Sequence, residues 1–118
     1  MDAAQRDLVE AGDDIPRFLR ANIDWHSAVA RASDNELLIG FMSALSQSIY
    51  AATNLEQFMD AEIRSITARA HAKITDAIRD QDGPAAMRRM ARHVCGFADA
   101  AARVDRRGQV ELSGPTED

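Results

Sequence analysis

The chain has 118 residues, 14 lysines and arginines against 19 aspartates and glutamates, a net charge of −5, and a single cysteine. This length fits one domain. The acidic balance argues against a free-standing nucleic-acid binder, which normally has a basic face, and a lone cysteine excludes an internal disulfide. No apolar run approaches the ~20 residues of a membrane helix, and the N-terminus lacks a signal-peptide core. We therefore expect a cytoplasmic protein with no membrane partner.

Helices are expected along most of the chain, because alanine, leucine, arginine and methionine are frequent and runs of β-branched residues are absent. Glycine and proline mark the breaks between them. The first helix is predicted over residues 3–11, and Gly12 suits the turn that ends it. The second is predicted over 13–32, with Pro16 in its first turn.

The third helix is predicted over residues 33–53, where Ser33 and Glu36 have the spacing of a capping box. A fourth and a fifth helix follow over about 59–79 and 84–104. Short turns between helices of this length favour antiparallel neighbours. The fold class predicted from the sequence is therefore an all-α, antiparallel bundle of four to five helices.

The C-terminal end is expected to differ from the rest. After Asp105 the chain is polar, and its only apolar residues are Val110 and Leu112. Such a segment is typical of a chain end without a packed core. We therefore predict one domain over residues 1–104 and a flexible tail over 105–118.

An apolar stripe at helical spacing marks the expected buried face of each of the four longer helices. Some stripe positions are polar, which is unusual for a core. The stripes are Phe18, Leu19, Asn22, His26, Val29 and Ala30; then Leu38, Phe41, Met42, Leu45 and Ile49; then Ile63, Thr67, Ala70, His71, Ile74 and Ile78; and last Ala86, Met90, His93, Phe97 and Ala101.

All three histidines lie on these inward stripes, each on a different helix: His26, His71 and His93. Asn22 precedes His26 by four residues, so both side chains share one helix face. Asp24 and Cys95 each lie two residues from a histidine and therefore point away from it. Trp25 is expected to pack against a neighbouring helix or subunit.

Three imidazoles and one side-chain oxygen inside a bundle form a ligand set for a transition metal. Three protein ligands with open positions are typical of metals that also bind water or a small molecule. The alternative is that each histidine is an ordinary buried residue with a hydrogen-bond partner. The spacing matches no short diagnostic metal motif, so the residues alone leave both interpretations open.

Residues 22–38 resemble a family pattern in which Asp-x-x-Phe-His is followed by Ala-Ser-x-Asn and a leucine-rich helix. The pattern belongs to the FCD domain, the effector-binding domain of the FadR subfamily of GntR-type bacterial transcription regulators. Its later motif His-x-x-Ile-x-x-Ala-Ile is matched by His71, Ile74, Ala77 and Ile78. Its Asp-x-x-x-Ala-x-x-x-Met-x-x-His is matched by Asp82, Ala86, Met90 and His93. The resemblance covers about residues 8–104.

The resemblance implies a set of four metal ligands, which by position are Asn22, His26, His71 and His93. The family usually has aspartate where this chain has Asn22. A neutral amide would hold the metal less tightly and leave one more unit of positive charge for an anionic effector. Asn22 could instead only hydrogen-bond a metal-bound water. Zinc or nickel is the expected metal, and manganese is a further candidate.

The function implied by the resemblance is ligand sensing rather than enzymatic catalysis. The domain would bind a divalent metal and a small organic acid and would form a homodimer. Relatives carry a further helix and a winged helix-turn-helix before this domain, and this sequence shows neither, so we expect no DNA binding by the chain itself. One alternative is a metal-dependent helical-bundle hydrolase, which needs a general base that the stripes do not offer. The other is a metal-free dimerisation module.

Overall fold

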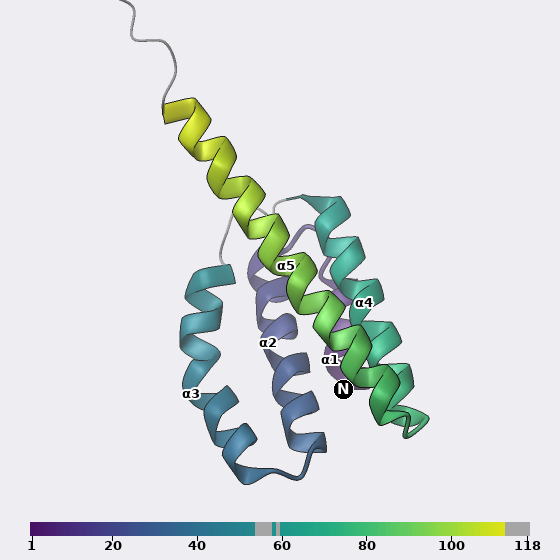
Figure 1. Ribbon diagram of the computed structural model, residues 1–118. Helices are drawn as coiled ribbons and strands as arrows, with labels where there is room; N and C mark the ends of the chain where they lie inside the picture. The colour runs from purple at the N-terminus through teal and green to yellow at the C-terminus, as the bar shows by residue number, and fades with distance from the viewer. Residues whose placement is uncertain (54–57, 59, 113–118) are drawn as a thin grey trace, which may run out of the picture.

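The computed structural model is all-helical over the residues it describes, with no strand among them (Figure 1). It describes residues 1–53, 58 and 60–112, with side chains except at 47, 49–53, 97, 98 and 100–112. The five helices are α1 (Asp2–Glu10), α2 (Ile15–Ala32), α3 (Glu36–Thr53), α4 (Ala61–Arg79) and α5 (Gly83–Leu112). The predicted fold class is confirmed. None of the described helices has the length and apolar character needed to span a membrane.

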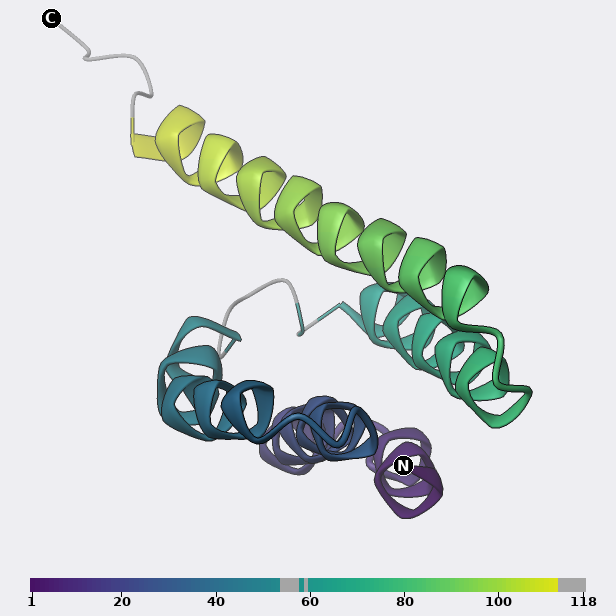
Figure 2. The same ribbon diagram turned by 60° about the horizontal axis from the view of Figure 1, so that its bottom comes forward.

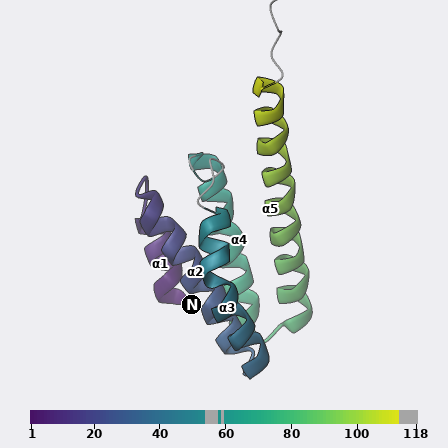
Figure 3. The same ribbon diagram turned by 90° about the vertical axis from the view of Figure 1, so that its left-hand side faces the viewer.

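The helices form two layers. Figure 2 shows α1, α2 and α3 side by side in one row, with α4 and α5 above them. Contacts agree with this view, because α2 packs against both α1 and α3, α4 packs against α1, and α5 packs against α4. The C-terminal half of α5 extends beyond the other helices (Figure 3).

The first two turns follow the local chemistry of the sequence. Gly12 has a φ of 54°, a conformation that glycine adopts without steric cost. The side chain of Asp14 caps α2 by accepting a hydrogen bond from the backbone N–H of Arg17, and Pro16 lies in the first turn. Both predicted roles, of Gly12 and of Pro16, are confirmed.

The start of α3 corrects the predicted capping box. Asn35 Oδ1 accepts hydrogen bonds from the backbone N–H groups of Leu37 and Leu38, at 3.1 and 3.2 Å, so Asn35 is the capping residue. Ser33 ends α2 instead, where its hydroxyl donates to the carbonyl of Ala30. Asp34 separates the two roles with a φ of 53°. This left-handed residue turns the chain after Ser33 and prevents a helix from starting there.

The last helix is longer than predicted. It begins at Gly83, after Asp82 Oδ1 accepts a hydrogen bond from the backbone N–H of Ala85. It continues to Leu112, although the sequence favoured an end near residue 104. Between Asp105 and this end, residues 106–112 contain two arginines and a single glycine, so their polar composition does not interrupt the helix. Residues 113–118 lie outside the described part of the chain.

The core lies where α1, α2 and α4 meet. Its largest fully buried side chains are Leu8, Phe18, Leu19, Trp25, Phe58, His71 and Ile74. The predicted stripes of the second and fourth helices are buried or half-buried. The stripe of α3 is only partly covered, since Leu38 and Phe41 are 40% and 58% exposed whereas Met42 and Leu45 are half-buried. Three predicted core positions, Ile49, Phe97 and Ala101, lie outside the described side chains.

Candidate metal centre

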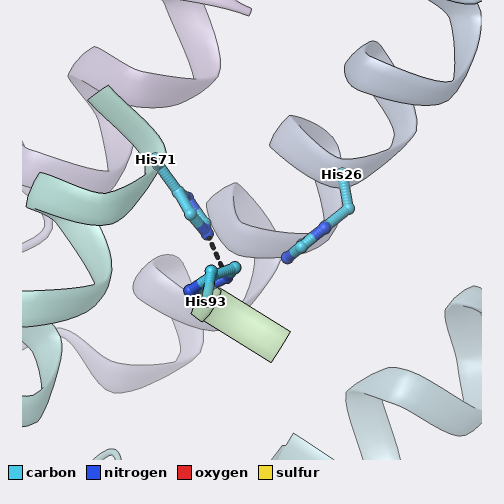
Figure 4. Close-up of side chains that lie close together, drawn as sticks. All are labelled: His26, His71 and His93. Carbon is cyan, nitrogen blue, oxygen red and sulfur yellow. Dashed lines mark hydrogen bonds between the residues drawn. The ribbon is translucent and has the colours of Figure 1, made fainter. Parts of the chain in front are cut away.

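Three helices bring His26, His71 and His93 together (Figure 4). One ring nitrogen from each histidine lies within 4.8 Å of the other two. The residues come from α2, α4 and α5, which the sequence had placed on separate inward stripes. The three stripes therefore converge on one point, as the helical periodicity predicted.

The closest pair in this cluster is His71 and His93. Their Nε2 atoms are 3.0 Å apart and share a hydrogen bond (Figure 4). Two nitrogens bound to one tetrahedral zinc ion are separated by ~3.4 Å, given a Zn–N bond of about 2.1 Å. The spacing in the cluster, from 3.0 Å to at most 4.8 Å, therefore brackets the separation that a shared metal ion requires.

Burial keeps the cluster uncharged. Burial, together with the neighbouring His26 and His93, lowers the pKa of His71 to about 2. Burial and the proximity of His93 lower the pKa of His26 to about 4. The pKa of His93 is lowered by burial as well. All three imidazoles are therefore neutral at pH 7, and neutral imidazole is the form that binds metal ions.

Asn22 lies one turn before His26 on α2 and is 5% exposed. Its Oδ1 atom is buried and has no hydrogen-bond partner among the described residues. An unpaired buried acceptor costs free energy, so native proteins rarely leave one without a role. The side chain has the burial and the free oxygen that a ligand needs, and its ligation of a metal stays a prediction.

Trp25 is the site residue whose role the sequence did not reveal. Its indole ring stacks on His71 with a centroid distance of 3.7 Å and an interplanar angle of 6°. Its Nε1–H donates a hydrogen bond of 3.0 Å to Thr75 Oγ1. The side chain thus packs against a neighbouring helix, one of the two expected locations. The sequence shows that Thr75 follows His71 by four residues and shares its helix face, but this spacing does not indicate which helix packs there.

Neither acidic residues nor the cysteine join the cluster. Asp24 and Cys95 are both exposed, in agreement with the helix geometry. In the described part of the chain, the three histidines are the only group of histidine, cysteine and carboxylate side chains spaced to hold a metal. The site therefore has nitrogen donors and no negative charge of its own.

Comparison with known proteins supplies the family. No curated protein and no solved structure matches the chain. The model of the FCD domain family matches residues 1–95. The match includes the whole histidine cluster, together with Asn22 and Trp25, which precede His26 on the same helix. The chain belongs to the FCD domain family, the ligand-sensing domains of GntR-type transcription regulators.

Proposed function

We propose that this domain senses a small carboxylate effector through a divalent metal ion held by His26, His71 and His93, with Asn22 as the fourth ligand. The observation that carries the proposal is the convergence of three neutral ring nitrogens within 4.8 Å. Buried histidines usually find a hydrogen-bond partner, and His71 and His93 already share one. Three histidines whose ring nitrogens face one another, in a ligand-sensing domain, fit a shared metal ion better than three unrelated core positions.

The donor set favours particular metals. Imidazole nitrogen suits zinc, nickel, copper and iron, whereas manganese prefers carboxylate and other oxygen ligands. The cluster has three nitrogens and no carboxylate among the described residues. We therefore place zinc and nickel before manganese. The unpaired Oδ1 of Asn22 would add one neutral oxygen.

The chemistry of the site favours an anionic effector. A bound metal would supply a Lewis acid to anchor a carboxylate. The histidines and Asn22 add no negative charge, so the full charge of a divalent ion remains for the effector to neutralise. Because the ligands lie on three helices, filling the site would favour one packing of those helices over another, which is a population shift.

The regulatory setting follows the family. We propose a homodimer in the cytoplasm that reaches DNA through a separate winged helix-turn-helix. FCD domains are regulatory and not typically enzymes, and the cluster offers no carboxylate as a general base. This weakens the hydrolase alternative. A metal-free dimerisation module would leave Asn22 Oδ1 buried and unpaired, which weakens the third interpretation.

Elemental analysis of the purified protein tests the proposal, together with identification of any co-purified small acids. We expect one zinc or nickel ion per chain. Calorimetry should show citrate or lactate binding to metal-loaded protein and no binding after chelator treatment. The Cys95→Ser variant is the matched control, because it removes an exposed metal-reactive group outside the cluster. Stoichiometric metal in the wild type that disappears in Cys95→Ser would contradict the proposed site.

A further inference from the structure

One side chain touches all three histidines of the cluster. Trp25 is fully buried, stacks on His71, and meets the rings of His26 and His93 edge-to-face, at centroid distances of 4.9 and 6.4 Å. Trp25 is also the only tryptophan in the chain. The indole therefore forms one wall of the cluster, and a change in its orientation would alter its contacts with all three imidazoles.

His71 lacks the anchor that orients most ligand imidazoles. A metal-bound histidine usually donates its second ring N–H to a carboxylate, a carbonyl or a water, which fixes the ring. Nδ1 of His71 is buried and has no hydrogen-bond partner among the described residues. The ring is instead held flat against the indole at 3.7 Å. Stacking thus takes the place that a hydrogen bond usually has.

The indole is itself held in place from α4. Its Nε1–H donates to Thr75 Oγ1, and Thr75 is 5% exposed. His71 and Thr75 are four residues apart on α4, so the ring and its support share one helix face. Trp25 on α2 therefore fits against two adjacent positions of α4, and the contact fixes both the distance and the plane of His71.

We propose that Trp25 is a positioning residue for His71 and that Thr75 holds Trp25 in the orientation this requires. The proposal rests on the proposed metal site and explains what makes His71 a preformed ligand. An imidazole that binds a cation becomes electron-poor, and the electron-rich face of an indole attracts such a ring. The stack therefore favours the metal-bound form of His71 over the free form.

The first experiment uses the metal-free protein. Ring protons of His71 above the indole face should show upfield ring-current shifts in NMR spectra. Thr75→Val keeps the shape of the side chain and removes the acceptor, so we expect these shifts to move toward ordinary histidine values. Unchanged His71 shifts in Thr75→Val would overturn the proposal, because the ring plane would then not depend on the Trp25–Thr75 contact.

The second experiment measures Co²⁺ binding by its visible absorption, which reports coordination geometry. We expect Thr75→Val and Trp25→Phe each to weaken Co²⁺ binding by about tenfold, the scale typical of losing a group that orients a ligand histidine. The absorption band should also change shape. Phe18→Leu is the matched control. It removes a buried core aromatic that contacts Phe58, so it should lower stability and leave the Co²⁺ affinity and band unchanged.

The two experiments separate two kinds of failure. If wild-type protein binds no Co²⁺, the proposed metal site is wrong, while shifted His71 signals in Thr75→Val still support the orienting role of Trp25. If wild-type protein binds Co²⁺ and both variants bind it equally well with the same spectrum, the positioning role is wrong and the metal site stands.

Discussion

Helices α2 and α3 have the same length, 18 residues, and lie side by side, yet they are buried to very different degrees. Helix α2 buries six residues, including Trp25 and Asn22. Helix α3 has the more apolar sequence, but none of its described side chains is buried, and Leu37 is 82% exposed. The number of neighbouring helices explains the difference, because α2 lies between two helices whereas α3 packs against α2. An apolar sequence predicts that a helix face will be covered, and the arrangement of the neighbouring helices determines which element covers it.

The largest effect is expected in the histidine cluster, which the buried helix α2 shares with α4 and α5. His71→Ala should abolish stoichiometric metal in the purified protein, because it removes the ligand that is fully buried and preformed. The loss of affinity should exceed the 10- to 100-fold that typically follows loss of a residue orienting a ligand. Elemental analysis of His71→Ala beside Cys95→Ser measures it. Full metal content in His71→Ala would move the site elsewhere.

The next prediction concerns the exposed side, where we propose that a second copy of the chain covers α3. Phe41 is 58% exposed, and Phe41→Glu should convert a dimer into a monomer in sedimentation experiments while the helical content is kept. Val9→Glu is the control, since Val9 is an equally exposed apolar residue on α1. A dimer that survives Phe41→Glu would show that α3 lies outside the interface.

Acidification should lower the stability of the protein through the buried cluster and not through α3. The three histidines lie on α2, α4 and α5, and none lies on α3. Unfolded histidines titrate near pH ~6.5, whereas the folded pKa is about 4 for His26 and about 2 for His71. The unfolded state therefore takes up protons first. Stability of the metal-free protein should be full above pH ~6.5 and fall toward pH 4 by about 1.4 kcal/mol per pH unit for each such histidine.

Urea unfolding at several pH values measures this slope, and His71→Phe should make it shallower by removing one titrating group. A free energy of unfolding that stays constant from pH 6.5 to 5 would contradict the burial of the cluster.

A smaller effect is expected at Asn22, the remaining predicted ligand on α2. Asn22→Asp should bind the metal about tenfold more tightly, since a charged oxygen adds Coulomb attraction. Binding of citrate or lactate should weaken, because the site loses one unit of positive charge. Chelator competition and calorimetry measure the two changes, and Asn22→Ala controls for loss of the amide. If neither affinity changes in Asn22→Asp, Asn22 is not a ligand.

The smallest effect is expected at the start of α3. Asn35→Ala should lower the free energy of unfolding by about 1 kcal/mol, because it removes the side chain that caps the helix. Ser33→Ala should cost less, since its hydroxyl satisfies no N–H group within α3. Thermal unfolding of the two variants compares them, and an equal or larger loss in Ser33→Ala would restore Ser33 as the cap.

The sequence was sufficient to predict the helices and the inward face of each histidine, because both follow from the local period of 3.6 residues. These inward faces made a meeting of the three histidines an expectation, although the meeting itself depends on how α2, α4 and α5 pack. The sequence could not predict the stack of Trp25 on His71, which depends on how α2 is rotated against α4. Nor could it choose between Ser33 and Asn35 as the cap. Both residue types cap helices, and the backbone conformation of Asp34 decided the matter. The helical period had already placed Asn22 on the face of His26, and the family pattern added that this position is a metal ligand in relatives.

The length of α5 turns a small local movement into a larger distant one. The helix starts at Gly83, packs on α4, and then extends alone (Figure 3). His93 lies about 15 Å along it and Leu112 about 44 Å, at 1.5 Å per residue. Widening the His71–His93 nitrogen separation from 3.0 Å to the ~3.4 Å of a shared tetrahedral ion would move Leu112 by roughly 1.2 Å if α5 turned as a rigid rod about Gly83. Turning in this way, α5 would act as a lever arm, and the displacement at Leu112 would be about three times the displacement at His93.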